Sequence, residues 1–525
     1  LAFIGQRRGR PMALHQIPDK DEATFDMICA ADTVGVFQIE SRAQMAMLPR
    51  LRPRCFYDLV VEVALVRPGP IQGGAVHPYL DRRRGLVPVT YPGPRDGQDL
   101  RQALGRTLGV PIFQEQVMQI AMIAAGFTPG MADDLRRSMA AWKRKGGVHR
   151  FEKPLLDGML AKGYRPEFAQ AIFQQMLGFG EYGFPESHAH SFALLAYASS
   201  WLKCHEPACF LAALLNSLPM GFYTASQLVQ DARRHGVRVL PIDVTCSDID
   251  CTLEGTPEPL RPARGLGVPP LPQPAVRLGL RLVGSLHKDA AERLVEARAT
   301  GPAFANTEDL ALRAQLSQQD LQALAAADAL AGLSGHRRQQ MWEAAAQHTA
   351  PPLLRDVPVH EAPLQLLAAP EGEEILFDYA ATGLTLRRHP LALLRPRLAR
   401  WRLQTALQLN TVPHGRKVRA CGIVTVRQRP GTAKGTMFVT LEDETGPVNV
   451  IVWPALVETW RNALLRSQLL AVEGVWQCSV PEGEGADAPS PSASVVRHLV
   501  AQRFKDLTPL LGRMAQALQG SRDFH

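Results

Sequence analysis

The hydrophobic pattern of this 525-residue chain changes its period near residue 416, and this change limits the folds that the chain can adopt. Between residues 110 and 215, apolar side chains recur at helical spacing, over 116–125, 132–142, 191–202 and 208–218. Beyond residue 416, five runs predict strands at 417–428, 436–442, 448–452, 469–477 and 495–503. The length leaves room for roughly three or four domains, so we expect a multidomain chain that ends in β-structure.

The five predicted strands fit one small β architecture. A Gly-rich turn at 431–435 joins the first two strands, and a low-complexity stretch at 482–494 reads as a mobile loop before the last strand. Five short strands connected in this way are typical of an OB-fold barrel. We therefore predict an OB-fold near the end of the chain.

The region before these strands predicts short helices on flexible connections. Residues 255–275 are rich in Pro and Gly and read as a linker, and 345–410 form a second connection. Between them we expect helices at 289–297, 306–312 and 317–326, with Gly-containing connections around Gly284 and Gly301. Helix–hairpin–helix units have this form and present backbone N–H groups to phosphates. A plain bundle of short helices is the alternative.

The first eighty residues predict short helices alternating with extended pieces. A charged segment at 19–22 precedes apolar residues at helical spacing, so a helix should start there. Residues 34–39 read as a short strand. The apolar run 59–66 ends at Arg67-Pro68-Gly69-Pro70, where proline and glycine force a turn. Residues 183–188 form a second proline turn, which should open a long apolar helix.

Composition narrows the class of protein and its partners. Charged residues make up 21% of the chain and no run of eighteen apolar residues occurs, so we expect a cytoplasmic protein without membrane contact. The net charge of +8 fits a polyanionic partner, although many basic proteins bind none. The eight cysteines match no common zinc template and are expected to be reduced and mostly buried.

Arg136 and Arg137 are the sharpest local signal for a ligand. Neighbouring residues point about 100° apart on a helix, so both guanidiniums should meet only on a large group such as a triphosphate. The alternative is one solvated arginine and one paired with Asp133 or Asp134. A basic turn, Lys143-Arg144-Lys145, follows this helix and would extend the same positive surface.

Two turns carry further candidate binding residues. Arg67, on the stiff proline turn, is expected either to contact a ligand or to cap the C-terminus of its helix. In the second turn Tyr182 can stack on a base, and Ser187 and His188 can donate to phosphates or base edges. The alternative there is an ordinary proline turn with packed rings. His188 and His190 diverge on a helix, so we predict no metal site.

The paired carboxylates in the chain do not read as a catalytic centre. Asp19 and Asp21 stand just before a helix and are expected to cap it. Asp248 and Asp250 lie in a loop. A two-metal site needs carboxylates clustered on a rigid sheet, so we predict neither a metal ligand nor a catalytic residue in either pair.

Taken together, the motifs resemble those of the α-subunit class of bacterial family C DNA polymerases, and they are most similar to the error-prone branch of that class. The resemblance extends over nearly all of the chain. Residues 185–186 and 219–223 are the ones similar to the error-prone branch. The motifs that carry the resemblance are residues 31–42, 66–70, 113–119, 135–137, 180–188, 215–217 with 219–223, and 441–446.

The resemblance implies an architecture. Residues 1–255 would hold the end of the palm connection and a mainly α fingers domain, and 256–345 a helix–hairpin–helix region that grips duplex DNA. Residues 346–410 would be a connecting helical segment, 411–510 the OB-fold domain and 511–525 a C-terminal tail.

The resemblance also implies roles for individual residues. Arg136 and Arg137 would hold the incoming triphosphate, with Arg67, Ser187 and His188 nearby in the nucleotide-binding set. The DNA-binding set would comprise Tyr182, Lys143, Arg144, Lys145 and Lys434.

One departure from the family is expected to affect activity. The family holds Mg²⁺ on a P-D-x-D-x-D strand and a later palm aspartate, and this sequence contains neither. We therefore expect an N-terminally truncated chain, also without the phosphoesterase-like domain, that binds deoxynucleoside triphosphates and primer–template DNA but does not catalyse nucleotidyl transfer alone.

The resemblance favours an error-prone DNA polymerase acting in damage tolerance as the parent protein. A replicative α subunit and a non-catalytic DNA-binding protein are the alternatives. The nearest candidate for a clamp-binding segment, residues 365–369, is a poor match. Clamp binding should therefore be weak or indirect, and a translesion-polymerase-like protein is the expected recruiting partner.

Overall fold

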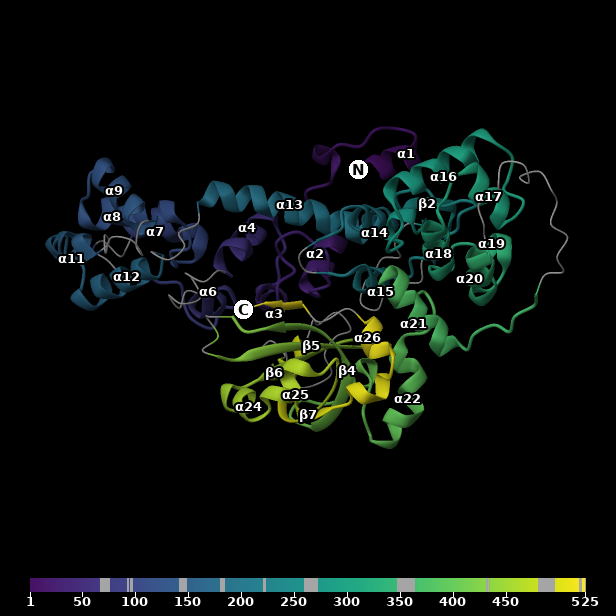
Figure 1. Ribbon diagram of the computed structural model, residues 1–525. Helices are drawn as coiled ribbons and strands as arrows, with labels where there is room; N and C mark the ends of the chain where they lie inside the picture. The colour runs from purple at the N-terminus through teal and green to yellow at the C-terminus, as the bar shows by residue number, and fades with distance from the viewer. Residues whose placement is uncertain are drawn as a thin grey trace.

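The computed structural model describes the chain except residues 67–75, 92–93, 95–97, 141–148, 180–184, 221–222, 259–271, 347–363, 431–432, 434, 480–495, 519–521 and 525. Figure 1 shows three regions: helices from the first half of the chain, a second helical region around a small sheet, and a β-barrel beside both. The predicted fold class is confirmed in its mainly helical regions and its C-terminal OB-type barrel. Among the described residues, no helix is long and apolar enough to cross a membrane.

The first helical region packs around the long helix α13 (Glu186–His205). Its buried face holds Ala189, Ala193 and Ala196, small side chains that let α4 approach closely. The predicted helix near residue 22 is present, and Asp21 caps it by accepting from the backbone N–H of Thr24 at 2.8 Å. The neighbouring helices are α1 (Ala2–Arg8), η1 (Leu14–Gln16), α2 (Glu22–Cys29), α3 (Arg42–Leu51), α4 (Phe56–Leu65) and α6 (Val76–Arg83).

A separate helical cluster forms one end of the molecule (Figure 1). Its core is built from residues such as Val117, Ile120, Leu135 and Phe173, which are almost fully buried. The helices are α7 (Gln98–Leu104), η3 (Gly105–Thr107), α8 (Gln114–Ala125), α9 (Pro129–Ala140), η4 (His149–Phe151), α11 (Glu152–Ala161) and α12 (Pro166–Phe179).

The second helical region continues from α13 through α14 (Pro207–Asn216) and α15 (Ala225–Arg234). A three-stranded sheet, in the order β1-β3-β2, joins this region to the short helices that follow. The strands are β1 (Val239–Leu240), β2 (Thr252–Glu258) and β3 (Gln273–Arg277). The helices are η5 (Leu280–Leu282), α16 (Lys288–Thr300), α17 (Thr307–Arg313), α18 (Gln318–Ala326), α19 (Ala331–Ser334) and α20 (Arg337–Ala346).

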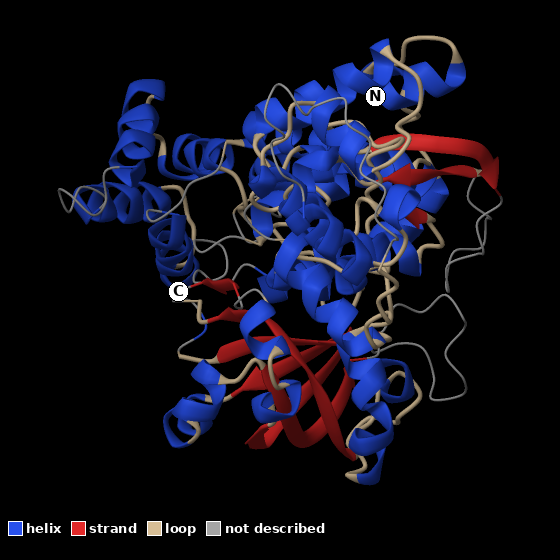
Figure 2. Cartoon of the chain, turned by 45° about the vertical axis from the view of Figure 1, so that its right-hand side comes forward, coloured by secondary structure: helices blue, strands red, loops and turns tan. Residues whose placement is uncertain are grey.

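Helices α21 (Glu371–Thr382), α22 (Pro390–Arg400) and α23 (Ala406–Leu409) lead into the barrel. The five predicted strands form it, in the order β5-β6-β8-β7-β4, and β4 closes it by pairing with β5. Figure 2 shows these strands in red below the helices. The strands are β4 (Lys417–Gln428), β5 (Met437–Asp443), β6 (Gly446–Val452), β7 (Leu469–Ser479) and β8 (Val496–Asp506). The helices among and after them are α24 (Pro454–Thr459), α25 (Arg461–Arg466), η8 (Thr508–Leu511) and α26 (Met514–Ala517).

The strand predicted at 34–39 is wrong. The segment forms turns instead, in which the N–H of Val36 donates to the carbonyl of Thr33 at 3.0 Å. Gly35 and Gln38 have φ of +76° and +66°, which an extended strand does not allow. The apolar spacing was misleading because Val36 and Ile39 are buried from a turn rather than from a strand.

The linker predicted at 255–275 is also wrong at both ends. Residues 252–258 form β2 and 273–277 form β3, and the two strands pair antiparallel. The expected boundary between residues 255 and 256 therefore falls inside β2. Most of the Pro- and Gly-rich residues that suggested a linker lie at 259–271, outside the described residues. In the predicted C-terminal tail, β9 (Arg522–Phe524) adds to the barrel by pairing in parallel with β4.

A buried ion cluster fixes α13 against α15 and the turn before α3. The Lys203 ammonium lies 2.9 Å from Asp32 and 2.9 Å from Asp231, and its side chain is 3% exposed. His235 Nε2 also contacts Asp32. Because both carboxylates are paired with cations, the cluster offsets the cost of burying its charges.

Replacing Lys203 with methionine should lower the free energy of unfolding by about 3–5 kcal/mol, because two carboxylates would be left facing one another without their shared cation. Chemical denaturation followed by circular dichroism measures this change. Lys288→Met is the matched control, since that side chain is 79% exposed and forms an exposed ion pair with Glu292 at 3.5 Å. Equal losses in the two variants would contradict a special role for the buried cluster.

The stability contributed by His235 should depend on pH. Burial is the largest single influence and opposes its protonation, but the charge and hydrogen bond of Asp32 together with the charge of Asp231 outweigh burial and raise the pKa of His235 to about 9. A raised folded-state pKa gives stability that is complete below the unfolded value near 6.5 and is lost as the pH rises through about 9. Between these values the wild type should lose on the order of 2 kcal/mol more than His235→Gln. Parallel curves for the two proteins would refute the assignment.

Candidate nucleotide and nucleic-acid interface

Arg136 and Arg137 lie side by side on α9, in the helical cluster at the end of the molecule. Leu135 anchors this part of the helix, because it is 1% exposed in the core of the cluster. The side chains of Arg136 and Arg137 are 40% and 69% exposed. Both guanidiniums are therefore accessible from solvent, on a helix held by a packed core.

Both arginines contact the same carboxylate. Arg136 reaches one oxygen of Asp133 at 2.9 Å, and Arg137 reaches the other at 2.8 Å. The hydrogen bond from Arg136 and the charges of the two arginines hold the pKa of Asp133 below its usual range. The expectation that only a large group can join two adjacent arginines is wrong here, because Asp133 lies one turn back at i−3 and i−4.

The start of α13 is a second polar constellation, assembled from three other elements. The N–H of Glu186 donates to Glu115 of α8 at 3.0 Å, which places a negative charge at the positive end of the helix dipole. The Glu186 carboxylate accepts from the Tyr57 hydroxyl at 3.1 Å and pairs with Arg106 at 3.3 Å. Arg106 also lies over the Tyr57 ring, 4.5 Å from its centre.

Sequence reasoning missed Tyr57, Arg106 and Glu115. Glu115 and Glu186 do stand inside motifs at 113–119 and 180–188, but nothing in the local pattern links the two. Tyr57 and Arg106 stand in no such motif, and only the fold brings them to the start of α13.

Ser187 and His188 are exposed in the first turn of α13, which begins directly after Pro185. The His188 ring lies 4.2 Å from that of Phe192, which in turn meets Phe37 edge-on at 5.3 Å. His190 instead faces back into the helix, with Nδ1 2.9 Å from the carbonyl of Glu186. Neither histidine belongs to a metal-ligand cluster of the described residues. Ser187 and His188 therefore lie on α13 and Arg136 and Arg137 on α9, and no contact between the two pairs is recorded in the described parts of the chain (Figure 1).

The remaining predicted site residues fall outside the described residues. They are Arg67, Tyr182, Lys143, Arg144, Lys145 and Lys434.

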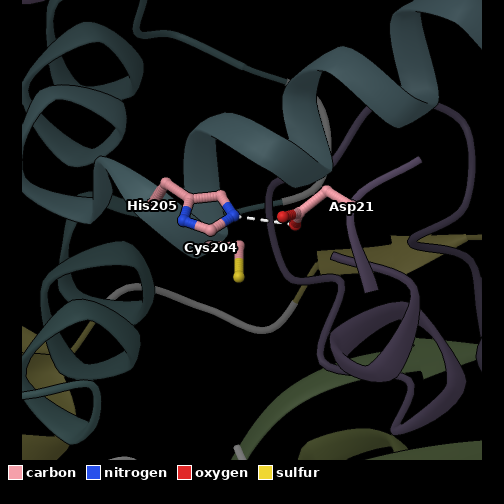
Figure 3. A group of neighbouring side chains, drawn as sticks. All are labelled: Asp21, Cys204 and His205. Carbon is pink, nitrogen blue, oxygen red and sulfur yellow. Dashed lines mark hydrogen bonds and ion pairs between the residues drawn. The ribbon is translucent and has the colours of Figure 1, made fainter. Parts of the chain in front are cut away.

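A cluster of Asp21, Cys204 and His205 has the chemistry of a metal-ligand set (Figure 3). His205 Nε2 lies 2.7 Å from Asp21, whose carboxylate also accepts from the backbone and hydroxyl of Thr24. Burial raises the pKa of Cys204 to about 12, so the sulfur is a thiol rather than a thiolate. The Asp21 carboxylate is already committed to capping α2 and to its contact with His205.

The second cluster, Asp32, Asp231 and His235, does not fit Mg²⁺. The Lys203 ammonium already bridges the two carboxylates, whereas Mg²⁺ needs oxygen ligands and retained waters in octahedral geometry. The ammonium thus occupies the position between the carboxylates that a cation would take.

The loop carboxylates Asp248 and Asp250 are likewise paired with arginines. Asp248 contacts Arg298 at 2.8 Å, and Asp250 contacts Arg281 at 2.7 Å. The two side chains therefore serve as ion-pair partners of η5 and α16, the helices that follow the small sheet.

Comparison with known protein families agrees with this arrangement. Residues 1–163 match the finger domain of the bacterial DNA polymerase III alpha subunit. Residues 236–340 match a helix-hairpin-helix motif, and 418–506 match an OB-fold nucleic acid binding domain. The three matched modules follow one another along the chain in the same order as the helical, hairpin and barrel regions of the fold.

Individual relatives narrow the class. The chain is 61% identical over its whole length to an error-prone DNA polymerase of Bordetella bronchiseptica, of which it covers 47%. It is 59% identical to that of Burkholderia pseudomallei over 98% of the chain, and 56% identical to that of Methylococcus capsulatus over 100%. The chain is therefore homologous to the error-prone DNA polymerases and spans about half the length of these curated relatives.

Proposed function

We propose that this chain is the nucleotide- and DNA-holding part of an error-prone, DNA-directed DNA polymerase. In this proposal the whole enzyme adds deoxynucleotides to a primer, including opposite damaged templates, and depends on Mg²⁺. The observation that carries the proposal is the succession of fingers, hairpin region and OB barrel in one folded chain.

The pair on α9 supports the role in nucleotide binding. Asp133 compensates two guanidiniums that are both open to solvent, so an incoming triphosphate can replace it with more charge and more acceptor oxygens. Arginine keeps its charge at any working pH and matches phosphate with a planar fork of donors. Arg67, Ser187 and His188 are proposed to lie near the nucleotide as well.

The hairpin region and the barrel support the role in DNA binding. Helix–hairpin–helix units and helix N-termini bind phosphates without reading sequence, as a polymerase requires. OB-folds bind strands on the face formed by their second and third strands, here β5 and β6. The proposed DNA contacts outside the described residues are Tyr182, Lys143, Arg144, Lys145 and Lys434. A translesion-polymerase-like partner and indirect clamp contact remain part of the proposal.

A binding measurement on the chain itself tests the DNA-holding role. Its affinity for primer–template DNA should fall steeply with salt, with a log–log slope of about −0.9 for each phosphate neutralised. Fluorescence anisotropy of labelled DNA at several salt concentrations measures this slope. A chain that binds no DNA at low salt would refute the proposal, and an affinity independent of salt would contradict phosphate recognition.

Arg136→Ala should raise the apparent KM for the incoming nucleotide in the complete polymerase by about tenfold or more, because it removes a charge-assisted phosphate contact. Primer extension at varied nucleotide concentrations measures this effect. Arg165→Ala is the matched control, since this exposed arginine stands at the start of α12 in the same cluster. An unchanged KM in Arg136→Ala, or the same rise in both variants, would contradict the proposed role.

A further inference from the structure

The outer surface of the barrel carries a basic groove on the side away from β5 and β6. Two adjoining hollows, of about 550 and 500 Å³, share Arg402, Leu403, Arg419 and Glu473 as lining residues. Their volumes are in the range of ligand sites. The groove lies between the end of α22 and the strands β4, β7 and β8.

The strand register explains why the floor of the groove is charged. Arg419, Glu473 and Arg503 stand opposite one another on β4, β7 and β8, so their side chains form one row on the same face. Further along, Cys421 and Ala471 of the same face are buried with α21 and α22. The helices therefore cover one part of this sheet face and leave the charged part open.

The charge in the groove is predominantly positive. Six basic residues line the two hollows, and Glu473 is the only acid among the lining residues. Glu473 pairs with Arg419 at 2.8 Å, and within the described chain no ion pair is recorded for Arg400, Arg402 or Arg503. The basic residues are Arg400, Arg402, Lys417, Arg419, Arg503 and Lys505.

Trp401 adds an aromatic surface to this charge. It ends α22, followed by Arg402 in the left-handed region at φ +57°, and it is 38% exposed. The Arg397 guanidinium and the Lys505 ammonium each lie 5.5 Å from the indole. A base can take the place of one of these two cations on the indole, and the displaced cation can then bind the adjoining phosphate.

We propose that this groove is a second binding site for single-stranded DNA, with Trp401 as the stacking platform. The proposal rests on the proposed DNA-holding function. A single strand fits better than a duplex, because only an unstacked base can reach the indole, whereas a duplex offers mainly phosphates. The usual OB face is partly engaged elsewhere, since Asn449 of β6 already bonds to Arg42 of α3. The groove is thus placed to hold a strand that leaves the duplex.

Anisotropy titrations with fluorescein-labelled oligo(dT) and with a blunt duplex test the proposal. Trp401→Ala should weaken oligo(dT) binding by about tenfold while leaving duplex binding within twofold, and Trp401→Phe should restore most of the loss. Arg503→Gln should reduce the oligo(dT) salt slope by about 0.7, the value for one single-strand phosphate. Because Arg503 is exposed, Arg503→Gln should fold, and it still tests the proposal if Trp401→Ala fails to fold.

Two control variants separate this groove from other surfaces. Trp342→Ala removes an indole from α20, and Trp453→Ala removes one that follows β6 directly; both side chains are 53% exposed, more than Trp401. Oligo(dT) binding that depends on Trp453 but not on Trp401 would overturn the proposal, as would equal losses for oligo(dT) and duplex. A wild type that binds neither DNA would instead refute the DNA-holding function itself.

Discussion

The buried ammonium of Lys203 is the contact on which the arrangement of this chain depends. It joins α13 to α15 and to the turn at residue 32, through two carboxylates at 2.9 Å. From α15, Arg234 reaches Glu442 on the barrel at 3.5 Å. One charged cluster thus sets the position of the long helix whose first turn carries Ser187 and His188. Through α15, the same cluster also connects this helix to the barrel.

The two candidate binding surfaces have one physical feature in common. Each contains exposed cations that are bound only weakly by a partner within the chain. On α9, Asp133 occupies two arginines that remain 40% and 69% exposed. In the barrel groove, the Trp401 ring occupies Arg397 and Lys505. Exposed pairs of this kind contribute little stability, so a polyphosphate or a nucleic-acid strand can replace them at low cost.

The sequence predicted the parts of the fold that depend on local periodicity. The helices predicted near 116–125, 191–202, 208–218, 289–297, 306–312 and 317–326 and all five barrel strands follow from spacing and from proline or glycine breaks, because burial on one face requires that spacing. It failed at Gly35 and Gln38, where positive φ turns an apolar segment away from a strand. It also failed at β2 and β3, since pairing between distant segments leaves no local signal.

The candidate site was predictable only in part, for the same reason. Arg136, Ser187 and His188 stand in recognisable motifs, but the contact of Tyr57, Arg106 and Glu115 with the start of α13 depends on packing. Trp401 carried no signal, because its partner Lys505 lies on the last strand of the barrel.

The most direct test of the central claim is a structure of the complete polymerase with primer–template DNA and an incoming nucleotide. The account predicts that Arg136 and Arg137 leave Asp133 and bind the triphosphate. A bound triphosphate elsewhere, with both arginines still on Asp133, would contradict it.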